Sequence, residues 1–132
     1  MLKPKVQRLA DSFIQACNEQ GIEIIIIEGY RSIKRQNELY EKGRTTPGPI
    51  VTNAKGGQSL HNYGVAFDIC FLVNGNRTYS GDWEKVGKIG ESLGLEWGGN
   101  WISFRDRPHF QYMAGYTLLS FINKRIDESR FA

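Results

Sequence analysis

The segment at residues 63–73 constrains the fold more than any other part of the chain. Every second residue in it is apolar and falls on one face of an extended strand: Val65, Phe67, Ile69 and Phe71. Asp68 falls on the opposite face, beside the small side chain of Ala66. Burying an ionised carboxylate costs several kcal/mol unless a counter-charge or a metal ion compensates for it. We therefore expect a half-buried strand whose second face carries a functional carboxylate.

The spacing of apolar residues predicts the other elements. Helical spacing at residues 3–20 ends at Gly21, and Ser32 and Asp82 are suited to cap helices at residues 34–42 and 82–93. A further amphipathic helix is expected at residues 117–129. Strands are expected at residues 22–27 and 109–112, and Asn74-Gly75 is typical of a hairpin turn. This order indicates an α+β fold, with a small antiparallel sheet flanked by helices.

Two stretches have no regular pattern. Residues 45–58, TTPGPIVTNAKGGQ, are rich in proline and glycine and predict a long loop, and long loops in compact domains are often functional. We expect this loop to shape a substrate cleft. Residues 96–107 are aromatic and irregular, and Trp97 and Trp101 are expected in the wall of that cleft or in the core beneath it.

Size and composition limit the class of protein. The 132 residues suit one domain, residues 1–132, and 40% hydrophobic with 12% aromatic residues suffices for a core. No run approaches the ~20 apolar residues of a membrane span, so we expect no membrane insertion. The net charge of +3 is mild and scattered, which argues against nucleic acid and fits attraction to an anionic polymer. We expect a monomer.

The two cysteines, Cys17 and Cys70, lie far apart and form no CxxC pattern. This spacing excludes a zinc site built from cysteine thiolates. Cys17 lies at an apolar position of the first helix, and free cysteine usually behaves as a small hydrophobic residue. We therefore expect Cys17 in the core.

The only histidines of the chain, His61 and His109, flank the inward-facing Asp68 in the sequence. Gly64 allows the chain to turn so that His61 reaches the face that carries Asp68. Two histidines and one aspartate with an open fourth position are typical of a catalytic zinc centre, whereas structural zinc has four protein ligands. The alternative is that each histidine is an ordinary hydrogen-bonded residue.

A hydrolytic zinc site also needs a general base close to the metal. Asp106 is a candidate because Pro108 stiffens the short segment that joins it to His109. The alternative is a solvated aspartate in a turn. Arg31, at the end of the first strand, could polarise a carbonyl group or hold a substrate carboxylate, although an arginine after a strand is often a plain surface residue.

Four motifs together resemble one known family. They are GYRS at residues 29–32, SLHNYGVAFD at 59–68, WGGNW at 97–101 and DRPHF at 106–110. The chain resembles the VanY-type zinc peptidases, the D-alanyl-D-alanine carboxypeptidases and L-alanyl-D-glutamate endopeptidases that cut peptidoglycan stem peptides. The resemblance runs from about residue 21 to residue 112 and implies the zinc fold shared by Hedgehog domains and D,D-peptidases.

The resemblance also implies roles for individual residues. His61, Asp68 and His109 would bind Zn2+, Asp106 would be the catalytic base, and Arg31 would stabilise the oxyanion or bind substrate. Ser59 and Gln36 would contribute to substrate binding. The long loop, and an aspartate rather than a glutamate before the last histidine, resemble the phage endolysin and autolysin endopeptidases.

The leading hypothesis is therefore a zinc-dependent peptidoglycan hydrolase that cuts the L-alanyl-D-glutamate bond of stem peptides. A D-alanyl-D-alanine carboxypeptidase would use the same metal chemistry on a different register of the peptide. A non-catalytic Hedgehog-like zinc module would have no need of Asp106 or Arg31, and a metal-free wall-binding domain would have no need of the three candidate ligands.

The first residues, MLKPKVQRLADSF, contain no apolar stretch of the kind found in signal peptides. We therefore expect synthesis in the cytoplasm and action on the cell wall after release, as for a phage endolysin. If a signal peptide had been removed from the chain, the protein would instead be secreted.

Overall fold

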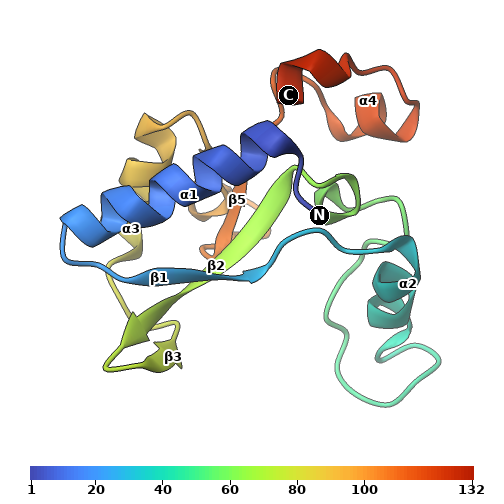
Figure 1. Cartoon of the computed structure of the whole chain (residues 1–132). Helices are drawn as coiled ribbons and strands as arrows, with labels where there is room; N and C mark the ends of the chain where they lie inside the picture. The colour runs from blue at the N-terminus through green and yellow to red at the C-terminus, as the bar shows by residue number, and fades with distance from the viewer.

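A five-stranded sheet in the order β1-β2-β5-β4 forms the centre of the molecule, with β3 paired to β2 beside this path. The structure is a computed structural model that describes residues 1–132 (Figure 1). All pairs are antiparallel. The strands are β1 (Ile24–Glu28), β2 (Ala66–Val73), β3 (Asn76–Thr78), β4 (Glu96–Trp97) and β5 (His109–Gln111). This architecture confirms the predicted α+β class.

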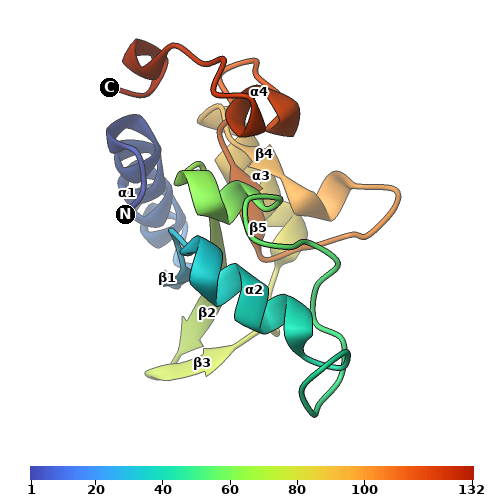
Figure 2. The same cartoon turned by 90° about the vertical axis from the view of Figure 1, so that its right-hand side faces the viewer.

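The α-helices are α1 (Pro4–Glu19), α2 (Ile33–Glu41), α3 (Trp83–Ser92) and α4 (Leu118–Ile122). Three short 3-10 helices are η1 (Leu60–Tyr63), η2 (Gly98–Asn100) and η3 (Glu128–Phe131). Figure 1 shows α1 running across the sheet, with α2 standing apart from the sheet, and Figures 1 and 2 both show α2 beside the loop at residues 42–59. None of these helices has both the length and the hydropathy to cross a bilayer.

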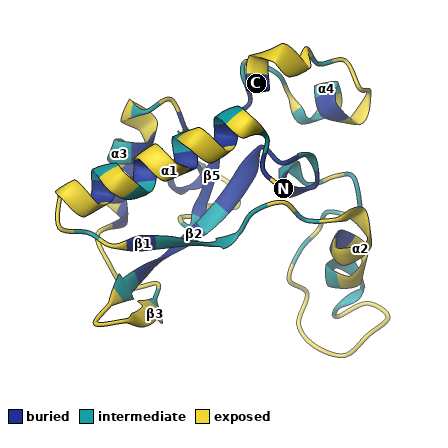
Figure 3. Cartoon of the chain, viewed as in Figure 1, coloured by how far each residue is buried: buried dark blue, intermediate teal, exposed yellow.

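The core lies between the sheet and the α1–α3 pair. Phe13 of α1 packs on Phe67 and Phe110 of the sheet, with ring centroids 6.3 and 4.6 Å away, and Trp97 stacks on Phe110. Figure 3 shows the buried residues gathered on β2 and on the inner side of α1. Burying one such phenylalanine stabilises a fold by roughly 1.5–3 kcal/mol. This packing orients the sheet, so its opposite face is left for polar residues.

The register of β2 with β5 decides which polar residues share that opposite face. Phe67 lies opposite Phe110 on the core side, so Asp68 opposite His109 and Ala66 opposite Gln111 point the other way. The alternation at residues 63–73 therefore places Asp68 on the face opposite the core, as predicted. The register also places Asp68 next to His109, although the two residues are distant in sequence.

Capping and turn residues act as the sequence predicts. The Ser32 side chain accepts a hydrogen bond from the Arg35 amide (3.0 Å), and Asp82 accepts one from the Lys85 amide (3.1 Å). Asn74 and Gly75 have φ angles of 52° and 78°, the left-handed conformations that a tight two-residue hairpin requires. These local signals set the bounds of α2, α3 and the β2–β3 hairpin.

Two predictions about the strands differ from the structure. The strand expected from residue 63 begins at Ala66, because residues 60–63 form η1. Residues 96–107, expected to be irregular, contain β4 and η2. Pairing with β5 gives this short segment its strand geometry, and a strand that depends on a distant partner leaves little local signal.

The helix expected at residues 117–129 is interrupted. Only α4 (Leu118–Ile122) forms, and Lys124 then takes a φ of 54° while the Arg125 amide donates to the carbonyl of Ser120. This reversal allows both Phe121 and Phe131 to pack near the ring of Tyr116. A continuous helix would lose this packing.

Candidate metal centre and catalytic cleft

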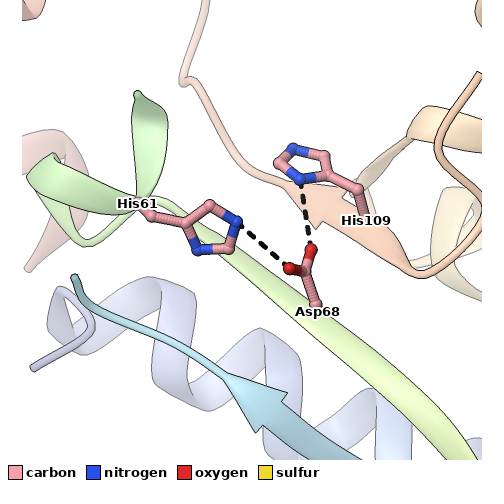
Figure 4. A group of neighbouring side chains, drawn as sticks. All are labelled: His61, Asp68 and His109. Atoms are coloured by element: carbon pink, nitrogen blue, oxygen red, sulfur yellow. Dashed lines mark ion pairs between the residues drawn. The ribbon is translucent and has the colours of Figure 1, made fainter. Parts of the chain in front are cut away.

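His61, Asp68 and His109 converge from η1, β2 and β5 (Figure 4). Their potential ligand atoms all lie within 4.8 Å of one another. Asp68 lies between the imidazoles, with Oδ2 3.4 Å from His61 Nε2 and Oδ1 3.3 Å from His109 Nδ1. The two rings are nearly perpendicular, with centroids 5.4 Å apart. The tertiary structure thus brings the three predicted ligands to one point.

The η1 turn presents His61 to this point. Ser59 caps η1 by accepting a hydrogen bond from the His61 amide (3.3 Å), and Asn62 donates from its side chain to the Arg31 carbonyl (2.9 Å). Gly64 ends η1 with a φ of 70°, and a Cβ there would lie 2.8 Å from the Met1 carbonyl oxygen. The turn therefore requires a glycine at this position.

Hydrogen bonds determine which nitrogen of each imidazole carries the proton. His61 Nδ1 is 2.9 Å from the Gly29 carbonyl oxygen, which can only accept, so Nδ1 donates and the Nε2 lone pair faces Asp68. In the neutral ring, His109 Nε2, which is 2.8 Å from Gln111 Oε1, donates to that oxygen, and the Nδ1 lone pair faces Asp68. Two lone pairs and a carboxylate are thus directed at one another.

This donor set fits a metal cation. Asp68 Oδ1 is buried and has no hydrogen-bond partner, which is costly unless a cation compensates for it. Two imidazole nitrogens and one carboxylate oxygen, open toward solvent on the fourth side, are ligands that a catalytic Zn2+ uses. We therefore regard the three residues as a candidate metal site.

The charges at this point interact strongly. Burial acts to raise the pKa of Asp68, but the two imidazoles outweigh it and hold the pKa of this carboxyl well below its usual range. Burial acts to lower the pKa of His109, yet the adjacent Asp68 raises it. A proton and a metal ion compete for the same His109 lone pair, so metal binding is expected to release a proton.

A cleft of about 370 Å3 opens over the three residues. Its wall includes Val51 and Thr52 from the long loop and Trp101 from the segment after η2. A neighbouring hollow of about 680 Å3 shares these residues and extends to Phe104. The long loop therefore lies on the predicted side, Trp101 belongs to the cleft wall, and Trp97 belongs to the core.

Asp106 is at the edge of the cleft. Its Oδ2 is 3.9 Å from His109 Nδ1, and its side chain is 46% exposed, so water can reach it. The Asp106 amide donates to the Gly98 carbonyl (3.0 Å), and its own carbonyl accepts from the His109 amide (3.2 Å). Burial, and then the charge of Asp68, raise the pKa of Asp106. A carboxylate here is placed to exchange protons with a group in the cleft.

Arg31 and Ser59, the residues predicted to bind substrate, both lie in the lining of this cleft. Arg31 Nε donates to Glu28 Oε1 and Nη1 donates to Gln36 Oε1, both at 2.9 Å. These bonds hold the guanidinium in one orientation, and its side chain remains 14% exposed.

Gln36 departs from the prediction of direct substrate binding. It is fully buried and lies outside the cleft lining. Its Oε1 accepts from Arg31, and its Nε2 donates to the carbonyl of Ala54 in the long loop (2.8 Å). Any effect of Gln36 on substrate therefore passes through Arg31 and the loop.

Four residues that were not predicted from the sequence hold these groups from behind: Glu28, Asn62, Glu96 and Gln111. A signal was present for Gln111, because residues two apart on a strand share a face and His109 is already a candidate ligand. Glu96 had no such signal, because it meets Gln111 only through the β4–β5 pairing.

Comparison with known sequences supports a family assignment. The family profile described as D-alanyl-D-alanine carboxypeptidase matches residues 52–112. The peptidoglycan L-alanyl-D-glutamate endopeptidase CwlK of Bacillus subtilis is 43% identical over 121 residues, covering 83% of this chain and 72% of CwlK. The L-alanyl-D-glutamate peptidase of Listeria phage A118 is 30% identical over 122 residues, covering 81% of this chain and 39% of that enzyme.

Solved structures show the same fold. The L-Ala D-Glu endopeptidase ChiX of Serratia marcescens is 26% identical with a TM-score of 0.55, covering 82% of this chain and 75% of ChiX. The vancomycin-resistance D,D-pentapeptidase VanY, solved with Zn(II), is 15% identical with a TM-score of 0.66, covering 98% of this chain and 83% of VanY. The likeness to VanY concerns the fold alone. Because CwlK is similar over most of both chains and the matched profile spans the candidate metal site, this chain belongs to the D-alanyl-D-alanine carboxypeptidase family of peptidases.

Proposed function

We propose that this protein is a zinc-dependent endopeptidase that hydrolyses the L-alanyl-D-glutamate bond of peptidoglycan stem peptides. The observation that carries the proposal is the convergence of His61, Asp68 and His109 under a cleft that also exposes Asp106 and Arg31. The names of the relatives CwlK and the phage A118 peptidase, and of the neighbour ChiX, supply the bond.

Each residue has a distinct part in the reaction. Zinc held by His61, Asp68 and His109 would supply a Lewis acid that polarises the scissile carbonyl and acidifies water. Asp106 takes a proton from the attacking water and returns it to the leaving amine as the carbon–nitrogen bond breaks. Arg31, oriented by Glu28 and Gln36, stabilises negative charge on the carbonyl oxygen. Ser59, which caps η1 and lines the cleft, would contact the peptide.

The place of action follows from the substrate. Stem peptides are part of the cell wall, and a net charge of +3 would favour retention on anionic wall polymers. That attraction should weaken as salt rises, because exposed charges are screened over ~8–10 Å at physiological ionic strength.

A second candidate is a D-alanyl-D-alanine carboxypeptidase, which the description of the matching family profile favours. Both reactions would use the same residues and differ only in the register of the bound peptide. The long loop that lines the cleft would decide that register.

Digestion of purified peptidoglycan separates the candidates. Mass spectrometry and end-group labelling of the products should show new N-terminal glutamate if the L-alanyl-D-glutamate bond is cut. Release of free alanine alone would establish the carboxypeptidase instead. The Asp106→Asn variant is the matched control for contaminating activity, and absence of any cleavage by the zinc-loaded wild type would favour a non-catalytic zinc module.

A further inference from the structure

A chain of hydrogen bonds leads away from the metal site through Gln111 to Glu96. We infer that Gln111 and Glu96 are positioning residues that select the metal-binding tautomer of His109. The inference rests on the proposed function, because it concerns the metal site described there. It adds two residues that are neither candidate ligands nor part of the cleft lining.

The strand pairing places the three side chains in a row. His109 and Gln111 are two apart on β5 and share a face, and Gln111 lies opposite Glu96 of β4. Gln111 Oε1 is 2.8 Å from His109 Nε2, and Gln111 Nε2 donates to Glu96 Oε2 at 2.7 Å. Both His109 and Gln111 are buried, with 6% and 7% exposed, so water does not readily replace either partner.

Glu96, at the outer end of this row, determines the direction of both hydrogen bonds. A carboxylate can only accept hydrogen bonds, so Glu96 requires the amide nitrogen of Gln111 to face it. The amide oxygen then faces His109, and only a protonated Nε2 can bond to it. The proton on Nε2 leaves Nδ1 with the lone pair that faces Asp68. Glu96 thereby determines a tautomer from the far side of the ring.

Without the Glu96 carboxylate, nothing would fix the orientation of the Gln111 amide. A free amide can rotate and offer its nitrogen to His109 Nε2, which favours the tautomer with the proton on Nδ1. That proton would face Asp68 and block the position of the metal. His61 is protected from such a change, because its partner is the Gly29 backbone carbonyl, which cannot donate. Only the His109 ligand therefore depends on side chains for its tautomer.

Three variants test the row. Gln111→Leu removes both hydrogen bonds at nearly constant size, and Glu96→Gln permits both amide orientations. The double variant Glu96→Gln/Gln111→Glu exchanges the carboxylate and the amide. The carboxylate introduced at position 111 can only accept from His109 Nε2, and the amide introduced at position 96 can donate to that carboxylate. Glu23→Gln is the matched control, an exposed glutamate at another edge of the sheet.

The measurements are zinc affinity, from competition with a chelator, and the His109 tautomer, from nitrogen-15 NMR of zinc-free protein at a pH where the imidazole is neutral. Loss of a residue that orients a metal ligand typically weakens metal binding by about 10–100-fold. We expect a loss of that size for Gln111→Leu, a smaller one for Glu96→Gln with mixed tautomers, and recovery to within a few-fold in the double variant. Glu23→Gln should bind zinc like the wild type.

Two outcomes would overturn the inference. One is wild-type protein with the His109 proton on Nδ1, and the other is Gln111→Leu with unchanged zinc affinity and tautomer. If Gln111→Leu fails to fold, the double variant decides, because a merely structural role would not be restored by reversing the donor and the acceptor. Neither readout depends on which peptide bond is cut, so the proposed reaction and this inference can fail separately.

Discussion

Asp68 lies directly opposite His109 in the antiparallel pairing of β2 with β5, and its Oδ1 is 3.3 Å from His109 Nδ1. The same register places Phe67 opposite Phe110 in the core. A slip of one residue would bring phenylalanines to the cleft and the carboxylate into the core, so core packing maintains the geometry of the candidate metal site. The geometry of the candidate ligands and the stability of the fold therefore depend on one register.

Asp68→Asn should abolish stoichiometric zinc binding, since it removes the charge of the central ligand and preserves its shape. Metal analysis of purified protein measures this directly. Chelation should lower the melting temperature of the wild type, because a ligand that binds only the folded state stabilises it, and should leave that of Asp68→Asn unchanged. Asp11→Asn, an exposed aspartate on α1, is the control. Full zinc occupancy in Asp68→Asn would refute the ligand assignment.

Asp106→Asn should keep zinc and fold but lose activity by about 10²–10⁴-fold, the usual contribution of a general base. Its side chain is at the cleft edge, and its backbone bonds to Gly98 and His109 do not involve the carboxylate. Turnover numbers at saturating substrate measure the loss of activity, and the zinc content shows whether the metal is retained. Turnover close to that of the wild type would exclude Asp106 as the base.

Gln36→Leu should reduce both stability and activity without changing zinc content. The substitution leaves the Ala54 carbonyl without its donor and frees the Arg31 guanidinium on one side. Because Ala54 is only partly buried, the loss of this hydrogen bond should cost about 0.5–1.5 kcal/mol in the free energy of unfolding. Denaturant unfolding and kcat/KM measure the two effects, with the exposed Gln15→Leu as the control. Unchanged kcat/KM would show that Arg31 needs no support from Gln36.

Gly98→Ala should impair catalysis although Gly98 touches no substrate. A Cβ at this position would collide with the carbonyl oxygen of Asp106 and lie 3.1 Å from His109 Cβ. Shifts of about 1 Å in a catalytic group can cost roughly 10²-fold in rate. The control is Gly29→Ala, also near the metal site, whose Cβ would meet only Leu2 at an ordinary 3.6 Å. Equal activity in the two variants would contradict this explanation.

The Cys17 thiol should stay unreactive in the folded protein. It is fully buried on α1, and burial raises its pKa to about 11, so the thiol remains protonated at neutral and mildly alkaline pH. Thiolates, not thiols, react with disulfide reagents, and Cys70 is buried as well. Spectrophotometric titration with such a reagent at pH 8 should therefore show reaction only after denaturation. Rapid labelling of native protein would disprove this.

Much of the site could be predicted from the sequence because its signals are local. The alternation around Asp68 requires an inward-facing carboxylate, and the scarcity of histidines leaves only His61 and His109 to join it. Capping by Ser32 and Asp82 and the turn at Asn74-Gly75 are equally local, since each depends on hydrogen bonds or φ angles within a few residues. The family resemblance depended on the same short motifs.

Only the tertiary structure decided the rest, because it depends on contacts between segments that are distant in sequence. The β4–β5 pairing brings Glu96 to Gln111, and no local pattern at either residue reports the other. From the sequence, Gln36 could be interpreted as a substrate-binding residue, but in the folded protein it is buried between Arg31 and Ala54. The helix expected at residues 117–129 is broken because the chain reverses at Lys124, and this reversal allows Phe121 and Phe131 to pack near Tyr116. Local hydrogen bonding and periodicity thus determined the candidate ligands, whereas long-range pairing and packing determined what holds them in place.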